Sequence, residues 1–116
     1  MLSYDTAGTG PPLVLLHAGV ADRRMWSGVT GPLTSAYTVI TPDLRGFGLS
    51  EPGTGSYSHA GDVAAVLADL GIRHATIVGA SFGALVALQL AHAAPTLWTP
   101  SCWPRHRCPA GRGRRP

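Results

Sequence analysis

A serine between two glycines is the residue of this sequence most suited to nucleophilic chemistry. Gly79, Ser81 and Gly83 form the pattern G-x-S-x-G, directly after an apolar run and directly before an Ala- and Leu-rich stretch. On a tight strand-to-helix turn, such a serine stands exposed above the sheet, and its neighbours two positions away must be small. The helix that follows directs free N–H groups at the serine, so the N–H of Phe82 is a candidate oxyanion donor. The pattern predicts attack by Ser81 on an acyl carbon, whereas the plainer alternative is that Ser81 only caps the helix.

Two further turns follow apolar runs and carry charged or aromatic groups. His17 is the last residue of the run LVLLH, and Ala18 and Gly19 follow it. Residues 43–50 (DLRGFGLS) follow the run YTVIT. On its own, His17 is typical of a structural histidine that ties loops together. The glycines of the second turn permit positive φ, and its charges are expected to pair within the loop.

These three motifs, in this order, resemble those of the α/β-hydrolase superfamily over roughly residues 2–97. The resemblance implies that the N–H groups of Gly19 and Phe82 form an oxyanion hole, in which each donor is worth on the order of a hundred-fold in rate. Ala18 stands where the family usually has glycine. The implied activity is hydrolysis of esters, lactones or other acyl compounds, or perhydrolysis. The dehalogenase and epoxide-hydrolase branches carry Asp as the nucleophile, so Ser81 points away from them.

The resemblance also gives structural roles to the remaining motif residues, which are His17, Gly79, Gly83, Asp43 and Arg45. Asp43 is interpreted as structural because the triad order in this fold is Ser, then acid, then His. The predicted site therefore consists of Ser81 and two backbone N–H groups.

The residues that would complete a triad are not found after Ser81. No Asp or Glu follows it, and the histidines that follow are His92 and His106. His92 lies about three turns along the next helix and should point elsewhere. His59 and His74 precede Ser81 and are expected at the surface. Without a general base the hydroxyl is a poor nucleophile, so the chain is expected to be truncated and weakly active or inactive. The alternative is a non-catalytic, hydrolase-derived stub whose basic tail makes it a binding module.

The elements that position these motifs are indicated by the apolar pattern. Strands are expected at 2–5, 13–17, 37–41 and 75–78, and helices between Arg24 and Ser35, between Ser58 and Leu70, and from Phe82 to His92. Ser58 is expected to cap the second helix and Gly71 to end it. In the third helix Leu85, Leu88 and Ala91 lie on one side. Strands that alternate with helices predict an α/β class, here a partial α/β-hydrolase fold with a mainly parallel sheet of about four strands.

The composition changes at residue 98 of the 116-residue chain. Residues 1–97 are expected to be the N-terminal part of a single α/β-hydrolase domain, with four Arg against six acidic residues. Residues 98–116 hold five Arg and no acid, and are expected to be a disordered Arg/Pro-rich tail. A shifted reading frame in GC-rich DNA is the favoured explanation, and a natural disordered tail the alternative. The strand before Ser81 would leave an open apolar edge, so marginal stability is expected.

Composition also indicates the surroundings and partners of the protein. No apolar stretch approaches the roughly 18 residues that span a bilayer, and no signal peptide is recognised, so a soluble, cytoplasmic protein without membrane binding is expected. Cys102, His106 and Cys108 lack the paired spacing of a zinc site, and neither metal nor cofactor is implied. The Arg-rich end lacks a nucleic-acid-binding fold, so the expected partner is a small ester, lactone or related acyl compound.

Overall fold

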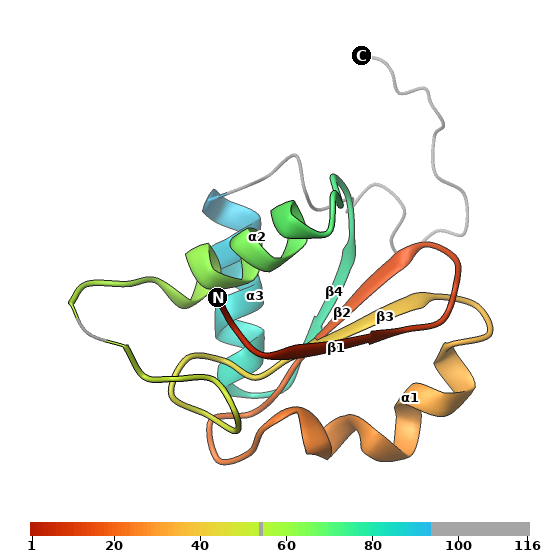
Figure 1. Cartoon of the computed structure of the whole chain (residues 1–116), viewed down its shortest axis with the longest axis horizontal. Coiled ribbons are helices and arrows are strands. Elements are labelled where there is room, and N and C mark those ends of the chain that lie inside the picture. The colour runs from red at the N-terminus through yellow and green to blue at the C-terminus, as the bar shows by residue number, and fades with distance from the viewer. Residues whose placement is uncertain (54, 94–116) are drawn as a thin grey trace.

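A four-stranded sheet with helices on both faces makes up the part of the chain that the computed structural model describes, residues 1–53 and 55–93 (Figure 1). The elements in chain order are β1 (Tyr4–Ala7), β2 (Pro12–Leu16), the 3₁₀ helix η1 (Arg23–Trp26), α1 (Ser27–Leu33), β3 (Thr38–Pro42), α2 (His59–Asp69), β4 (Thr76–Gly79) and α3 (Phe82–Ala93). The predicted tail and its cysteines lie outside the described residues.

The strand order in the sheet is β1-β3-β2-β4. Strand β2 runs parallel to both β3 and β4, and β1 runs antiparallel to β3. The predicted α/β class with a mainly parallel sheet of four strands is confirmed. Because parallel strands end at the same edge, the turns after β2, β3 and β4 meet there, and these turns carry the three motifs.

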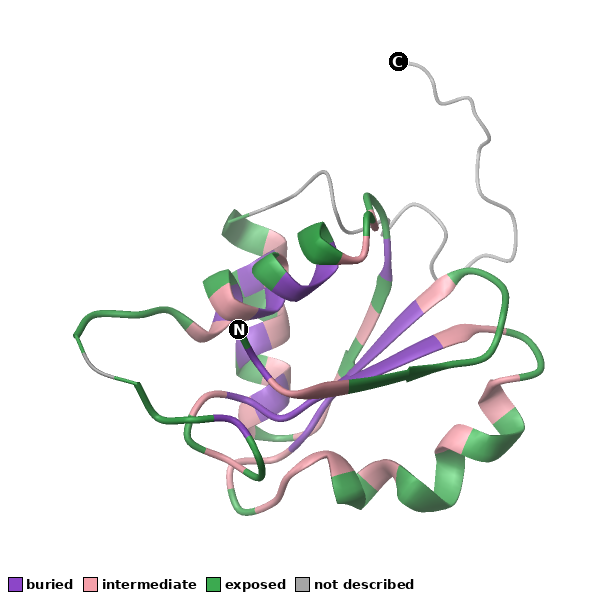
Figure 2. Ribbon diagram, in the orientation of Figure 1, coloured by how far each residue is buried: buried purple, intermediate pink, exposed green. Residues whose placement is uncertain are grey.

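Strand β2 is buried on both faces because layers of apolar side chains cover it from each side. Val14 and Leu16 point into the core beneath α2 and α3. Leu13 and Leu15 point the other way, into a smaller cluster that includes Trp26 beside α1. Successive side chains of a strand face opposite sides, which explains why the continuous run LVLLH is needed at this central position (Figure 2).

Helix α2 begins and ends where the sequence indicates. The Ser58 hydroxyl accepts a hydrogen bond from the N–H of Gly61 at 3.1 Å. Gly71, just past the helix, has a φ of +72°, which favours glycine. Both predicted helix-end residues are thus confirmed. The buried face of α2 includes Val63 and Leu67, which pack on the sheet.

Helix α3 buries a different face from the one marked by Leu85 and Leu88, whose side chains are 49% and 68% exposed. The buried residues are Gly83, Val86 and Leu90. The close approach of Gly83 to the backbone of β2 fixes the rotation of the helix, and residues three and seven positions further on then face the sheet. Among the described residues, no helix is long and apolar enough to cross a bilayer.

Candidate active site

Ser81 lies on the turn that joins β4 to α3, and its backbone is strained. Its φ of 55° is the only positive value among the non-glycine residues that the structure describes. Such a conformation costs of the order of 1–3 kcal/mol and persists only where surrounding contacts impose it. The N–H of Ala80 donates to the carbonyl of Leu16 at 3.0 Å, and the N–H of Ala84 donates to the carbonyl of Ser81 at 2.9 Å. The turn is therefore held between β2 and the first turn of α3, with Ser81 exposed at its tip.

The two glycines of this turn are required by close backbone contacts. A Cβ atom on Gly79 would overlap the carbonyl of Gly83, and one on Gly83 would overlap the carbonyl of Leu16. Any larger residue at either position would force the backbone of β2, β4 or α3 to move. The sequence reasoning expected small residues here, and these contacts supply the physical reason.

The turn after β2 contacts the first residue of α3. A Cβ atom on Gly19 would lie 3.2 Å from the Cβ of Phe82. The two residues predicted to supply oxyanion N–H groups are thus neighbours, although they are far apart in the sequence. Their role as donors stays a prediction.

His17 connects the turns after β2 and β3. Its side chain is fully buried, and Nε2 accepts a hydrogen bond from the N–H of Leu44 at 2.9 Å. Because Nε2 accepts, the proton lies on Nδ1, which donates to the carbonyl of Ala18 at 2.8 Å. The imidazole therefore bridges two motif loops within the protein interior and has no free nitrogen to act on a substrate.

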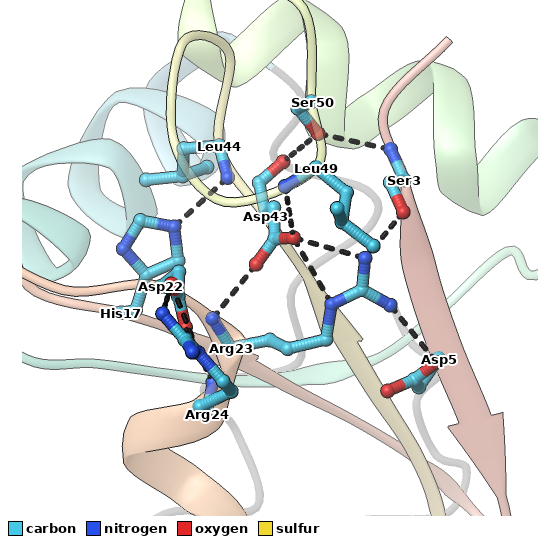
Figure 3. A network of polar contacts seen from close by, with 10 residues as sticks. All are labelled: Ser3, Asp5, His17, Asp22, Arg23, Arg24, Asp43, Leu44, Leu49 and Ser50. Carbon is cyan, nitrogen blue, oxygen red and sulfur yellow. Dashed lines mark hydrogen bonds and ion pairs between the residues drawn. The ribbon is translucent and has the colours of Figure 1, made fainter.

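Asp43 is the centre of a polar network beside the sheet (Figure 3). Its buried carboxylate accepts hydrogen bonds from the backbone N–H of Arg23 at 2.8 Å, from the Arg23 side chain at 2.9 and 3.1 Å, and from the N–H of Leu49 at 2.9 Å. Burial opposes ionisation of this carboxyl most strongly, but the Arg23 and backbone hydrogen bonds outweigh it and lower the pKa of Asp43. The carboxylate is saturated with donors, which suits a structural group.

The expectation that the charges of the 43–50 loop pair with each other is wrong. Asp43 pairs with Arg23, and Arg45 forms a two-point contact with Asp62 of α2 at 2.6 and 2.8 Å. The loop folds tightly over the Asp43 side chain, since a Cβ atom on Gly48 would overlap the Asp43 carboxylate. Gly46 and Gly48 both have positive φ, as predicted.

His59 is not at the surface, and this expectation was also wrong. The residue is half-buried, and its ring is perpendicular to those of Phe82 at 5.1 Å and Tyr57 at 5.2 Å between centroids. Burial lowers the pKa of His59. The sequence held a signal for this, because His59 lies four residues before Val63 on the apolar stripe of α2. His74 is exposed, as expected, and His92 is also exposed.

A cavity of about 610 Å³ lies beside the Asp43 network rather than beside Ser81; its lining residues include Asp22, Arg24, Ser27 and Leu49. Arg24 is paired with Asp22 at 2.8 Å, and this hydrogen bond lowers the pKa of Asp22 to about 2. Asp22 and Arg24 therefore already satisfy one another at the wall of this cavity. Within residues 1–53 and 55–93, no three His, Cys, Asp or Glu side chains are grouped to hold a metal ion.

Comparison with known proteins agrees with this geometry. The family model for the alpha/beta hydrolase fold matches residues 11–97. An uncharacterised protein of Mycobacterium tuberculosis is 39% identical over 99 residues, which cover 82% of this chain and 29% of that protein. A soluble epoxide hydrolase of Corynebacterium sp. strain C12 is 40% identical over 94 residues, 78% of this chain and 33% of that protein.

Among solved structures, Est816, described as an N-acyl homoserine lactone degrading enzyme, aligns with a TM-score of 0.80 and 37% identity, over 84% of this chain and 39% of that one. The chain thus spans between 29% and 39% of the length of these relatives. The family match covers all three motif turns and the strands β2, β3 and β4 that precede them. The chain belongs to the α/β-hydrolase fold family.

Proposed function

We propose that this chain carries the nucleophile and oxyanion hole of a serine hydrolase that acts on acyl compounds such as esters and lactones. The observation that supports this most is the turn at Ser81, where a non-glycine residue is held at positive φ between β4 and the start of α3. Strain of this kind at an exposed hydroxyl is typical of a nucleophile on an α/β sheet.

The proposed reaction follows from the groups that surround the turn. The Oγ of Ser81 attacks the acyl carbon, and the carbonyl oxygen becomes an oxyanion. The N–H groups of Gly19 and Phe82 donate hydrogen bonds to this oxyanion, assisted by the positive end of the α3 dipole. The leaving group departs with a proton, and water then hydrolyses the acyl-serine ester.

Acyl substrates are favoured over epoxides by the chemistry of the nucleophile. Attack by a serine hydroxyl on an epoxide would form an ether, which water does not cleave at a useful rate. Attack on an ester or lactone forms an acyl ester, which water does cleave. The lactone-degrading neighbour is consistent with this choice, and the epoxide hydrolase relative shares the fold but not the implied reaction.

The activity of this chain is expected to be low because no hydrogen bond joins the Ser81 hydroxyl to a basic group among the described residues. His17 is fully engaged inside the protein, and His92 lies near the end of α3. No Asp or Glu follows Ser81 in the sequence. Loss of a triad's base leaves only the contribution of the oxyanion hole and of binding, roughly 10³–10⁴-fold over water.

A fluorophosphonate probe with detection by mass spectrometry tests the proposal. We expect slow labelling of Ser81 at about pH 7 that accelerates toward about pH 9, because hydroxide replaces the missing base. The label should disappear in Ser81→Ala and persist in Ser35→Ala, which changes another exposed serine. A folded chain that remains unlabelled at Ser81 across this pH range would contradict the proposal.

A further inference from the structure

A continuous series of ring contacts crosses the candidate site. In order, the pairs and centroid distances are His17–Phe47 at 5.3 Å, Phe47–Phe82 at 6.3 Å, Phe82–His59 at 5.1 Å and His59–Tyr57 at 5.2 Å, and the guanidinium of Arg45 lies 4.4 Å above the Tyr57 ring. These rings come from the turns after β2 and β3, the start of α3 and the start of α2. The series therefore joins all three motif turns to α2.

Phe82 is the ring in this series closest to the proposed chemistry. It follows Ser81 directly, its N–H is a proposed oxyanion donor, and its side chain lies 3.2 Å from where a Cβ atom on Gly19, the other proposed donor, would be. Any force that moves the Phe82 ring is transmitted to the first residue of α3. The packing around this ring thus helps to determine where both N–H groups lie.

The ring of His59 packs against the ring of Phe82. The buried Nδ1 of His59 has no hydrogen-bond partner among the described residues. His17, at the other end of the series, uses both ring nitrogens in hydrogen bonds. A proton added to His59 would place a positive charge beside the Phe82 ring in a partly buried contact, without an acceptor at Nδ1.

The groups around His59 determine how readily it is protonated. Burial lowers the pKa of His59 most, Asp62 on α2 opposes this effect, and Arg45 and His17 add to it. Asp62 is already held by two hydrogen bonds from Arg45, so it is not free to turn toward His59. Phe82, the contact on α3, carries no charge.

We propose that His59 is a positioning residue for the oxyanion hole: its neutral ring holds Phe82 against Gly19, and protonation of His59 displaces the start of α3. This inference rests on the proposed function, in which the N–H groups of Phe82 and Gly19 receive the oxyanion. It predicts that the donor geometry is intact at neutral pH and is lost in mild acid.

The test is a pH titration of the full chain followed by ¹H–¹⁵N and histidine-ring NMR spectra. We expect the amide signals of Phe82 and Gly19 to shift with the same midpoint as the His59 ring, below the ordinary histidine value of 6.5. His59→Phe retains a ring without a titrating group and should abolish these shifts. His74→Gln, which changes an exposed histidine, should leave them in place.

Two results would overturn the proposal. In one, the amide signals of Phe82 and Gly19 remain fixed while the His59 ring titrates. In the other, the shifts persist in His59→Phe, which would assign them to His17. If the variant does not fold, the wild-type titration still decides, because the midpoints of both histidine rings are measured in the same sample.

Fluorophosphonate labelling separates this proposal from the function on which it rests. If amide shifts follow His59 but Ser81 is unreactive at every pH, the proposed function fails while the coupling of His59 to Phe82 stands. If Ser81 is labelled and its pH profile is the same in wild type and His59→Phe, the nucleophile is supported and the positioning role of His59 is overturned.

Discussion

Arg23 connects three separate segments of the chain. Its guanidinium contacts Asp43 at the end of β3, Asp5 in β1 and the hydroxyl of Ser3, while its own backbone begins η1. Its side chain is 12% exposed and that of Asp43 is 2% exposed, so water screens this pair weakly. The same pairing engages the carboxylate of Asp43, the acid that could be mistaken for a triad member.

Replacement of Arg23 should therefore destabilise the fold strongly. In Arg23→Leu the buried Asp43 carboxylate loses its counter-charge, and we expect the free energy of unfolding to fall by roughly 3 kcal/mol. This loss of stability is at the lower end of the range expected when one partner of a buried ion pair is removed. The reason is that two backbone N–H groups still donate hydrogen bonds to the Asp43 carboxylate. Arg24→Leu removes an Arg that is 86% exposed and screened by water, and its cost should be much smaller than that of Arg23→Leu. Urea denaturation of both variants makes the comparison.

The pH dependence of this difference checks its cause. The folded-state pKa of Asp43 is lowered, so the stability from its ionised form is fully present above the ordinary Asp pKa of about 4. It is lost as the pH falls through the folded-state pKa. The gap between wild type and Arg23→Leu should therefore be greatest near neutral pH and shrink below about pH 4. A gap that stays constant into acid would mean that packing, not charge, is responsible.

At the scale of the elements, the sequence predicts strands and α2 well because their patterns are local. Apolar runs place the strands within two residues of the observed ends, and the helix-end residues Ser58 and Gly71 are correct. The buried face of α3 could not be predicted in this way, since it is fixed by the contact between Gly83 and the Leu16 carbonyl on another element. The partners of Asp43 and Arg45 escape prediction for the same reason: they lie on η1 and α2.

Replacing each of two leucines of α3 by alanine tests which face of this helix is buried. Leu90 is buried in the core, whereas Leu88 is largely exposed. We expect Leu90→Ala to lower the free energy of unfolding by about 2–5 kcal/mol through lost burial and a cavity. Leu88→Ala should change it by no more than about 0.5 kcal/mol. Equal losses measured by thermal and urea unfolding would mean that α3 is rotated relative to this description.

At the scale of the molecule, the sheet is asymmetric in how well it is covered. Within residues 1–53 and 55–93, β4 pairs with β2 alone, and its other edge has no neighbouring strand. Val78 on β4 is exposed on the α1 side of the sheet, and Leu85 and Leu88 are exposed on α3, which covers the other side. An apolar sheet edge of this kind is prone to pair with other chains.

The chain should therefore self-associate through the free edge of β4. Val78→Lys places a charge on this edge strand at a residue that is 41% exposed, and we expect it to raise severalfold the protein concentration at which the monomer persists. Val29→Lys is the matched control, because Val29 is an exposed apolar residue on α1. Sedimentation velocity over a concentration series gives the readout. If both substitutions reduce association equally, the added net charge is responsible rather than the edge of β4. If the wild-type chain remains monomeric and unfolds in one cooperative thermal transition, this edge does not cause association.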